Sequence, residues 1–290
     1  MLKFIHITDL HLTATGELHQ GYDTTASFAK ALDNMLSMHG DAAFLVITGD
    51  LANWGELGAY RKLEALLKDF PLPVELMIGN HDHRASFLSV FGEWHPYETP
   101  YAHYCRDTAD FHLLFLDTAT IGTHGGDLSP DRLRWIDRRI GETDLPVLIF
   151  MHHHPVALRA PSLDAKGLLN WPAFHGVLAR HRTRIRHIFH GHCHMLLQGH
   201  VEGIPFTGLR SMGPQAYTDL KTDMACRWQA EPHYAVVLAD STSLVVHLNE
   251  FTYAGPVFQR QRQPFAEFIA HCAERGVIVP TSAAITEAAE

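Results

Sequence analysis

The stretch Leu76-Met77-Ile78-Gly79-Asn80-His81-Asp82 joins an apolar run to three polar side chains with no spacer between them. The apolar run predicts a buried strand that ends at Gly79. Asn80 offers a neutral oxygen ligand, His81 an imidazole, and Asp82 a carboxylate that can hold an imidazole in orientation. Asn and Asp are also common in turns, so the stretch alone is equally consistent with an ordinary strand-to-loop turn.

Strands and helices are predicted to alternate around this stretch. Apolar runs predict further buried strands at residues 2–8, 43–48, 146–151 and 186–189, and a hairpin at residues 101–117. Helical spacing of apolar side chains predicts helices near residues 22–38, 56–70, 84–91, 129–140 and 171–181. The pattern is typical of sheets with helices packed against them.

The C-terminal part of the chain has a different pattern. Short strands dominate from residue 196 onward, and antiparallel pairing is expected because the connections between them are short. Residues 213–232 are expected to be irregular, and residues 264–276 to contain a helix.

Metal-binding side chains follow five of the predicted strands. Because strand ends meet at one edge of a sheet, residues distant in sequence are expected to share one crevice. Oxygen and nitrogen ligands without thiolate suit Mn, Fe, Co or Zn in a hydrolytic site. There are more candidate ligands than one ion needs, and two ions about 3.5–4 Å apart would use them. The groups are Asp9 with His11, Asp50, Asn80 with His81, His152, and His192 with His194.

Each group has an ordinary alternative. Asp9-x-His11 is common by chance in polar loops, and Gly-Asp at residue 50 is common where a helix begins. The run His152–His154 lies in a chain with 23 histidines, so it can be accidental. His192-x-His194 is more telling, because alternate positions of an extended chain share one face. Chance does not readily explain five such groups, each at a strand end.

Length and composition limit the other possibilities. A chain of 290 residues with 46% hydrophobic and 19% charged residues is expected to form one large domain, or a domain with a small appendage. We find no apolar run near the roughly 18 residues of a membrane span and no leader-like start, so a cytoplasmic protein without membrane partners is expected. Four scattered cysteines predict free thiols, and a net charge of −9 disfavours binding to long nucleic acid.

The order D-x-H, G-D, G-N-H-D, H and G-H-x-H from Asp9 to His194 resembles the signature of the calcineurin-like metallophosphoesterases. Within that superfamily the chain is most similar to class III cyclic nucleotide phosphodiesterases and the related bacterial glycerophosphodiesterases. Three longer blocks support this likeness: residues 49–53, residues 149–155 and Tyr253-Ala254-Gly255-Pro256.

The resemblance implies an α/β fold, a four-layer αββα sandwich of two mixed β-sheets flanked by helices. It also implies a catalytic core at residues 1–210. Residues 211–290 would form a C-terminal segment continuous with that core, which shapes the substrate pocket and offers a dimerisation surface. A homo-oligomer is therefore expected.

The resemblance also implies a ligand set. Asp9, His11 and His194 would hold one metal ion, Asn80, His152 and His192 would hold the other, and Asp50 would bridge both. The ions would be two divalent or trivalent transition metals from among Mn, Fe, Zn and Co, with Mn or Fe favoured. His152 is preferred because similar sequences place the ligand directly after the methionine that ends the strand, but a register shift to His153 or His154 is left open.

His81 matches the family's histidine that is not a ligand. It would stabilise the phosphoryl oxygens or protonate the leaving alkoxide, and Asp82 would hold its ring in orientation. Asn53, His154 and Tyr217 are candidate substrate contacts, with a structural hydrogen bond as the alternative for each.

The expected function is a metal-dependent phosphodiesterase that hydrolyses cyclic nucleotides or glycerophosphodiesters by attack of a metal-bridging hydroxide. One alternative is a phosphomonoesterase or nuclease of the same superfamily. An alternative of another class is a non-catalytic metal-binding scaffold that keeps the fold and binds partners.

Overall fold

The structure, a computed structural model, describes residues 1–98, 100–258 and 264–277. Residues 1–253 form one compact unit. The described residues after it belong to a second unit, which contains helix α7 (Phe265–Glu274). In the described part of the chain we find no helix that is both long enough and apolar enough to cross a membrane.

Two mixed β-sheets form the centre of the first unit. One sheet has the strand order β13 (Leu244–Asn249), β12 (Tyr234–Ala239), β1 (Leu2–Ile7), β2 (Leu45–Thr48) and β3 (Val74–Met77). The other has the order β4 (Tyr104–Asp107), β5 (His112–Leu116), β6 (Val147–Met151), β7 (Ile185–His190), β9 (Ile204–Gly208) and β8 (Leu197–Val201). Strands β1 to β3 are parallel, as are β5, β6, β7 and β9, and the remaining neighbours are antiparallel.

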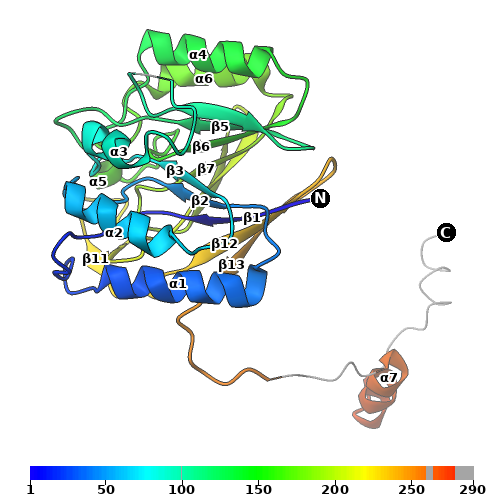
Figure 1. Ribbon diagram of the computed structural model, residues 1–290. Helices are drawn as coiled ribbons and strands as arrows, with labels where there is room; N and C mark the ends of the chain where they lie inside the picture. Colours follow the sequence, from blue (N-terminus) through cyan, green and yellow to red (C-terminus); the bar gives the residue numbers. More distant parts are fainter. Residues whose placement is uncertain (99, 259–263, 278–290) are drawn as a thin grey trace. The chain divides into compact units, whose positions relative to one another are not determined.

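Helices cover the outer faces of both sheets, which gives the expected four layers. Figure 1 shows α1 and α2 against the first sheet and α4 and α6 against the second. Ser129 caps α4 by accepting a hydrogen bond from the Arg132 amide, with Pro130 at the first helical position, as its sequence predicts. The helices are α1 (Thr24–His39), α2 (Leu57–Leu67), α3 (Arg84–Phe91), α4 (Pro130–Gly141), α5 (Pro161–Asp164) and α6 (Trp171–His181).

The two sheets are joined by a core of aromatic side chains. One ring from each of β4, β5, β6 and β7 stacks on the next, with centroid separations of 4.4, 5.0 and 5.2 Å. Phe4 of β1 meets two of these rings edge-on. Such pairs are stabilised beyond the area they bury, so they fix the spacing and angle between the sheets. The stacked rings are Tyr104, Phe115, Phe150 and Phe189.

The fold class predicted from sequence is confirmed, and most strands and helices fall within a few residues of their expected positions. Residues 213–232 are different, because two strands of two residues each, β10 (Gln215–Ala216) and β11 (Arg227–Trp228), form a small hairpin there. Strands so short leave no periodic signal in sequence. The division expected at residue 211 stays a prediction, and β12, which follows it, lies beside β1 in one sheet.

Buried histidines should make this fold sensitive to acid. Burial lowers the pKa of His187 from its usual 6.5 to about 4. In the pH interval between these two pKa values, this histidine binds a proton in the unfolded chain but not in the folded chain. Stability should therefore fall as the pH drops through the interval, by on the order of 1–3 kcal/mol for this residue. His187→Gln should remove that part of the loss, because glutamine can still contact Thr207 without titrating.

Urea unfolding at pH values of about 7.5 and 4.5 would measure the difference. The exposed His247 provides the matched variant His247→Gln, which should leave the pH dependence unchanged. Equal losses of stability in the wild-type protein and in His187→Gln would contradict the prediction.

Candidate metal centre

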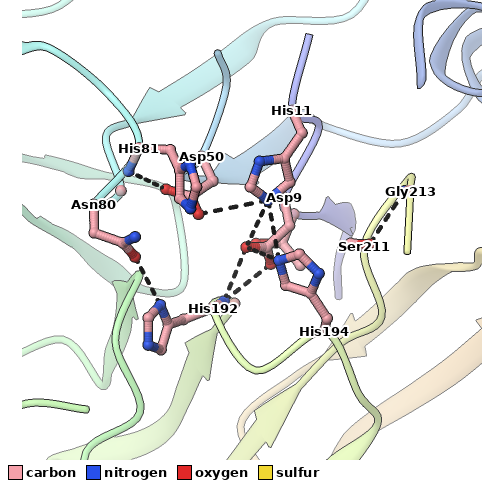
Figure 2. Close-up of polar contacts among 12 residues, drawn as sticks. Asp9, His11, Asp50, Asn80, His81, His192, His194, Ser211 and Gly213 are labelled. Atoms are coloured by element: carbon pink, nitrogen blue, oxygen red, sulfur yellow. Dashed lines mark hydrogen bonds and ion pairs between the residues drawn. The ribbon is translucent and has the colours of Figure 1, made fainter. Parts of the chain in front are cut away.

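The carboxyl ends of the parallel strands meet at one edge of the sandwich and bring the predicted ligands together (Figure 2). Four of them, Asp9, His11, Asp50 and His194, each offer a ligand atom within 4.8 Å of all the others. All four are buried. In the described residues this is the group that combines such proximity with acidic and imidazole ligands.

The first half of the centre lies after β1 and β7. His194 Nε2 is 3.3 Å from Asp9 Oδ1 and 3.0 Å from His11 Nε2. His11 Nε2 is also 3.6 Å from Asp50 Oδ2. Two imidazole nitrogens and two carboxylates therefore converge on one small volume.

The second half lies after β3, β6 and β7. His152 Nε2 is 3.1 Å from Asn80 Oδ1 and 3.3 Å from Asp50 Oδ1, and His192 Nδ1 is 2.7 Å from the same Asn80 oxygen. The two oxygens of Asp50 thus face different candidate ligands: Oδ2 faces His11, and Oδ1 faces His152. One carboxylate could contact two ions in this arrangement.

Oxygen atoms of the protein hold the imidazoles from behind. His152 Nδ1 contacts the Thr48 carbonyl oxygen at 2.8 Å and His194 Nδ1 the Pro214 carbonyl oxygen at 2.8 Å. A carbonyl can only accept, so each Nδ1 is the donor and each Nε2 is left with its lone pair directed at the centre. Ligand histidines in metal sites are typically oriented this way.

Backbone strain is concentrated at the same residues. Left-handed backbone costs a residue other than glycine about 1–3 kcal/mol, and such strain often marks functional sites. Gly79 is required for a related reason, since a Cβ there would lie 2.2 Å from Asp50 Oδ1. The strained candidate ligands are Asp9 (φ 53°), His11 (φ 47°), Asp50 (φ 50°), His192 (φ 68°) and His194 (φ 51°).

The electrostatics of the centre call for a cation. Burial alone would lower the pKa of His152, but the Asp50 carboxylate outweighs it and raises this pKa to about 9. The Asp50 carboxylate thus favours a positive charge beside His152 Nε2. A metal ion would supply that positive charge and bind the same two groups. Ligands 2.0–2.2 Å from one ion lie roughly 3–3.5 Å apart, close to the separations found here. The residues therefore fit a metal centre.

His81 lies beside the centre without joining either set of ligand contacts. Its Nδ1 donates to the Asn53 carbonyl oxygen at 2.9 Å, and its backbone amide donates to Asp50 Oδ1 at 2.8 Å. Its ring is 4.8 Å from that of His11, nearly perpendicular to it, and it lines the cavity. The Nε2 atom of His81 is therefore available to a bound molecule.

The predicted role of Asp82 in orienting His81 is wrong. Asp82 Oδ1 accepts hydrogen bonds from the Ala52 amide and the Tyr60 hydroxyl, and Oδ2 accepts them from the Leu51 and Gly79 amides, at 2.8–3.0 Å. These four bonds saturate the carboxylate. Asp82 instead ties the loop after β2 to the loop after β3.

Two of the three candidate substrate contacts make the structural hydrogen bonds that were the alternative for each. Asn53 is 2% exposed, and its side-chain oxygen contacts His11 Nδ1 at 3.1 Å. His154 is 2% exposed, and its ring nitrogens contact the carbonyl oxygens of Val156 and Leu163. Tyr217 lines the cavity with 57% of its surface exposed, so its role stays a prediction.

The alternative ligand His153 faces a different environment. Its Nδ1 contacts the Thr118 hydroxyl at 2.7 Å, and its Nε2 contacts the His124 carbonyl oxygen at 3.1 Å. Both ring nitrogens are thereby engaged away from Asp50 and Asn80. The geometry favours His152 in the second half of the centre.

Sequence reasoning missed His124. Its Nδ1 accepts a hydrogen bond from Asn80 Nδ2 at 2.9 Å, which turns the Asn80 oxygen toward His152 and His192. It lies on the long connection after β5, where neither spacing nor a neighbouring motif singles it out. The contact of His124 with Asn80 therefore has no sequence signal that we can identify.

A cavity of about 260 Å³ opens over the centre. One wall is apolar and belongs to a small separate hydrophobic cluster around Met195 and Ala216. The remaining wall is polar and contains several cationic or imidazole groups. Among the lining residues are His19, His81, His124, Lys166, Tyr217 and Arg227.

Comparisons with known proteins agree with this geometry. A model of the calcineurin-like phosphoesterase family matches residues 2–196. A probable cyclic nucleotide phosphodiesterase of Rhodopseudomonas palustris is 32% identical over 262 residues, 89% of this chain and 95% of its own. A glycerophosphodiester phosphodiesterase of Enterobacter lignolyticus is 27% identical over 196 residues, 66% of this chain and 70% of its own. The structure of a dimetal phosphatase from Danio rerio shares the fold, with a TM-score of 0.64 at 16% identity, over 87% of this chain and 96% of that one.

Asp82→Asn should destabilise the protein and weaken metal binding. The new side-chain NH₂ group would face amide donors that now reach a carboxylate oxygen, and losing a hydrogen bond to a charged group costs about 1.5–3 kcal/mol. Urea unfolding and metal content after dialysis would measure both effects. The exposed Asp69 supplies the control variant Asp69→Asn. Unchanged stability with reduced turnover would instead restore the role of orienting His81.

Proposed function

This chain belongs to the calcineurin-like phosphoesterase family, and from that premise we propose that it hydrolyses small phosphodiesters with the help of two metal ions. The observation that carries the proposal is the position of Asp50. Its two oxygens face two different sets of donors, which is what a carboxylate shared by two ions requires. Cyclic nucleotides and glycerophosphodiesters are the proposed substrates, in line with the names of the two similar proteins.

We assign the ligands as two sets that share Asp50. Asp9, His11 and His194 would hold one ion, and Asn80, His152 and His192 the other. Bound there, the ions would neutralise the phosphoryl oxygens and activate water as a nucleophile near neutral pH. Oxygen and imidazole ligands accept several transition metals, and manganese or iron is our preferred assignment.

His81 is proposed as the general acid. The Asn53 carbonyl oxygen holds the Nδ1–H group of His81, so the proton available to the substrate is on Nε2 of the protonated ring. As the attacking water gives up one proton to solvent and its oxygen bonds to phosphorus, the ester P–O bond would break and the His81 proton would pass to the leaving alkoxide. The products are a phosphomonoester and an alcohol, which are one molecule when the substrate is cyclic.

The cavity supports a small substrate. Its volume of about 260 Å³ and its one apolar wall suit a diester with a compact organic group. The net charge of −9 continues to disfavour long nucleic acid. A homo-oligomer and a cytoplasmic location remain predictions.

Removal of metal should abolish hydrolysis, and Asp50→Ala should do the same by lowering metal content. Losing the shared carboxylate leaves both ions without one ligand and unbalances the charge of the centre. The assay compares bis-p-nitrophenyl phosphate with p-nitrophenyl phosphate after reconstitution with Mn²⁺, Fe²⁺, Co²⁺ or Zn²⁺, alongside metal analysis.

The outcomes of this assay separate the alternatives. Faster hydrolysis of the diester than of the monoester would support the proposal. The substrates 3′,5′-cAMP, 2′,3′-cAMP and glycerophosphodiesters would then be tested. Preference for the monoester would favour a phosphomonoesterase, and metal binding without any hydrolysis would favour the scaffold. Full metal content and activity in Asp50→Ala would contradict the ligand assignment.

His81→Gln should spare metal content and lower turnover. The loss should be greatest for substrates with a high-pKa leaving group, because a poor alkoxide depends most on protonation, and general acid catalysis is worth about 10²- to 10⁴-fold. Rates for aryl and alkyl esters would be compared with metal content measured on the same samples. An equal loss for both ester classes, or a loss of metal, would contradict the role of general acid.

A further inference from the structure

We propose that Arg227 binds the phosphoryl group of the substrate, donating through its guanidinium to a non-bridging oxygen of the diester that occupies the metal centre. This inference rests on the proposed function and adds a substrate-binding residue to it. Arg227 belongs to the β10–β11 hairpin, in a region where the sequence pattern predicts only irregular chain.

The hairpin is attached directly to a candidate metal ligand. The Ala216 amide donates to the His194 carbonyl oxygen at 3.0 Å, and the Pro214 carbonyl oxygen accepts from His194 Nδ1 at 2.8 Å. In the hairpin register Ala216 lies directly opposite Arg227. Arg227 therefore lies on the strand next to Ala216, and Ala216 is hydrogen-bonded to His194.

The Arg227 side chain is directed into the cavity. Directly opposed residues of an antiparallel pair project from the same face, and both Ala216 and Arg227 line the cavity over the centre. Arg227 is an exposed residue of the hairpin. Partial desolvation lowers the pKa of its guanidinium, and the Asp9 carboxylate offsets this effect. The guanidinium also contributes to the lowered pKa of His19, whose ring stacks on that of His11. Arg227 thus lies on the Asp9 side of the centre.

The guanidinium has no structural partner among the residues that the structure describes: we find no hydrogen bond, ion pair or ring contact for it there. Two other arginines are engaged, since Arg84 pairs with Asp117 and Arg210 with Glu250. Once metal ions engage the carboxylates of the centre, the positive charge of Arg227 is left facing the cavity. The ligand that its planar donors match best is a phosphoryl group.

A contact with an ester arm of the substrate is the competing interpretation. Lys166 lines the cavity near His124 and acts on its pKa, so it suits that role better than Arg227 does. Arg227 belongs to the hairpin that is hydrogen-bonded to His194, and the Asp9 carboxylate raises the pKa of its guanidinium; both His194 and Asp9 are candidate ligands. Position therefore favours the reacting phosphoryl group for Arg227.

The test compares Arg227→Ala, Arg227→Lys and the control Lys221→Ala. Lys221 lies in the connection between the same two strands and is exposed, so its variant makes the same change of charge in the same loop. Metal-reconstituted proteins would be titrated with inorganic phosphate by calorimetry. They would also be assayed with bis-p-nitrophenyl phosphate and 3′,5′-cAMP, with metal content measured in parallel.

Arg227→Ala should weaken phosphate binding and lower kcat/KM for both diesters alike, by roughly 10- to 150-fold, the usual range for a hydrogen bond to a charged group. Metal content should not change, Arg227→Lys should recover part of the loss, and added guanidinium ion should rescue Arg227→Ala. Lys221→Ala should match the wild-type protein.

Three results would overturn the inference: a loss for 3′,5′-cAMP alone, unchanged phosphate affinity, or a fall in metal content. The first would assign Arg227 to an ester arm, and the last would make it a structural residue. The phosphate titration does not depend on turnover. A wild-type protein that hydrolyses no diester would therefore defeat the proposed function while still leaving Arg227 open to test.

Discussion

Two carboxylates buried side by side, Asp9 and Asp50, are the constraint around which this molecule is arranged. Both are almost inaccessible to solvent, and isolated buried charges of one sign are costly. The fold answers with imidazoles at 3.3–3.6 Å and with backbone amides, such as that of His192, which donates to Asp9 Oδ2 at 2.9 Å. The backbone amides stabilise the negative charge, and the neutral imidazoles keep their lone pairs, so the centre remains suited to cations.

The sandwich supplies the precision that this constraint demands. Three parallel strands of one sheet and two of the other deliver the ligands. Each half of the centre takes ligands from both sheets, so the spacing and angle between the sheets set the distances within each half. The edge-on contacts of Phe4 with Phe150 and Phe189, which join the two sheets, help to hold that angle. The left-handed backbone at Asp9 and His194 is strained, and the surrounding hydrogen bonds are what keep it in place.

Sequence alone could predict the sheets, the helices and the residues that gather at the strand ends, because each depends on local patterns. It could not assign the partners of Asp82, Asn53 and His154, since a hydrogen bond between two loops leaves no mark in spacing. Asp82 follows His81 directly, yet its carboxylate turns back to the loop after β2. The position of Asp82 next to His81 in sequence therefore led to a wrong prediction. Strands as short as β10 and β11 could not be predicted, because two residues show no alternation of apolar and polar side chains.

His194 contacts both the metal centre and the segment before the β10–β11 hairpin, and this double contact has a thermodynamic consequence. Its ring belongs to the centre, while its carbonyl oxygen and Nδ1 bind the segment that leads into the β10–β11 hairpin. An ion that fixes the ring thereby restrains the hairpin, and a ligand that restrains the hairpin fixes the ring. Such coupling is reciprocal, so occupancy of the centre and occupancy of the cavity above it would each strengthen the other. Cofactor retention would then depend on substrate concentration.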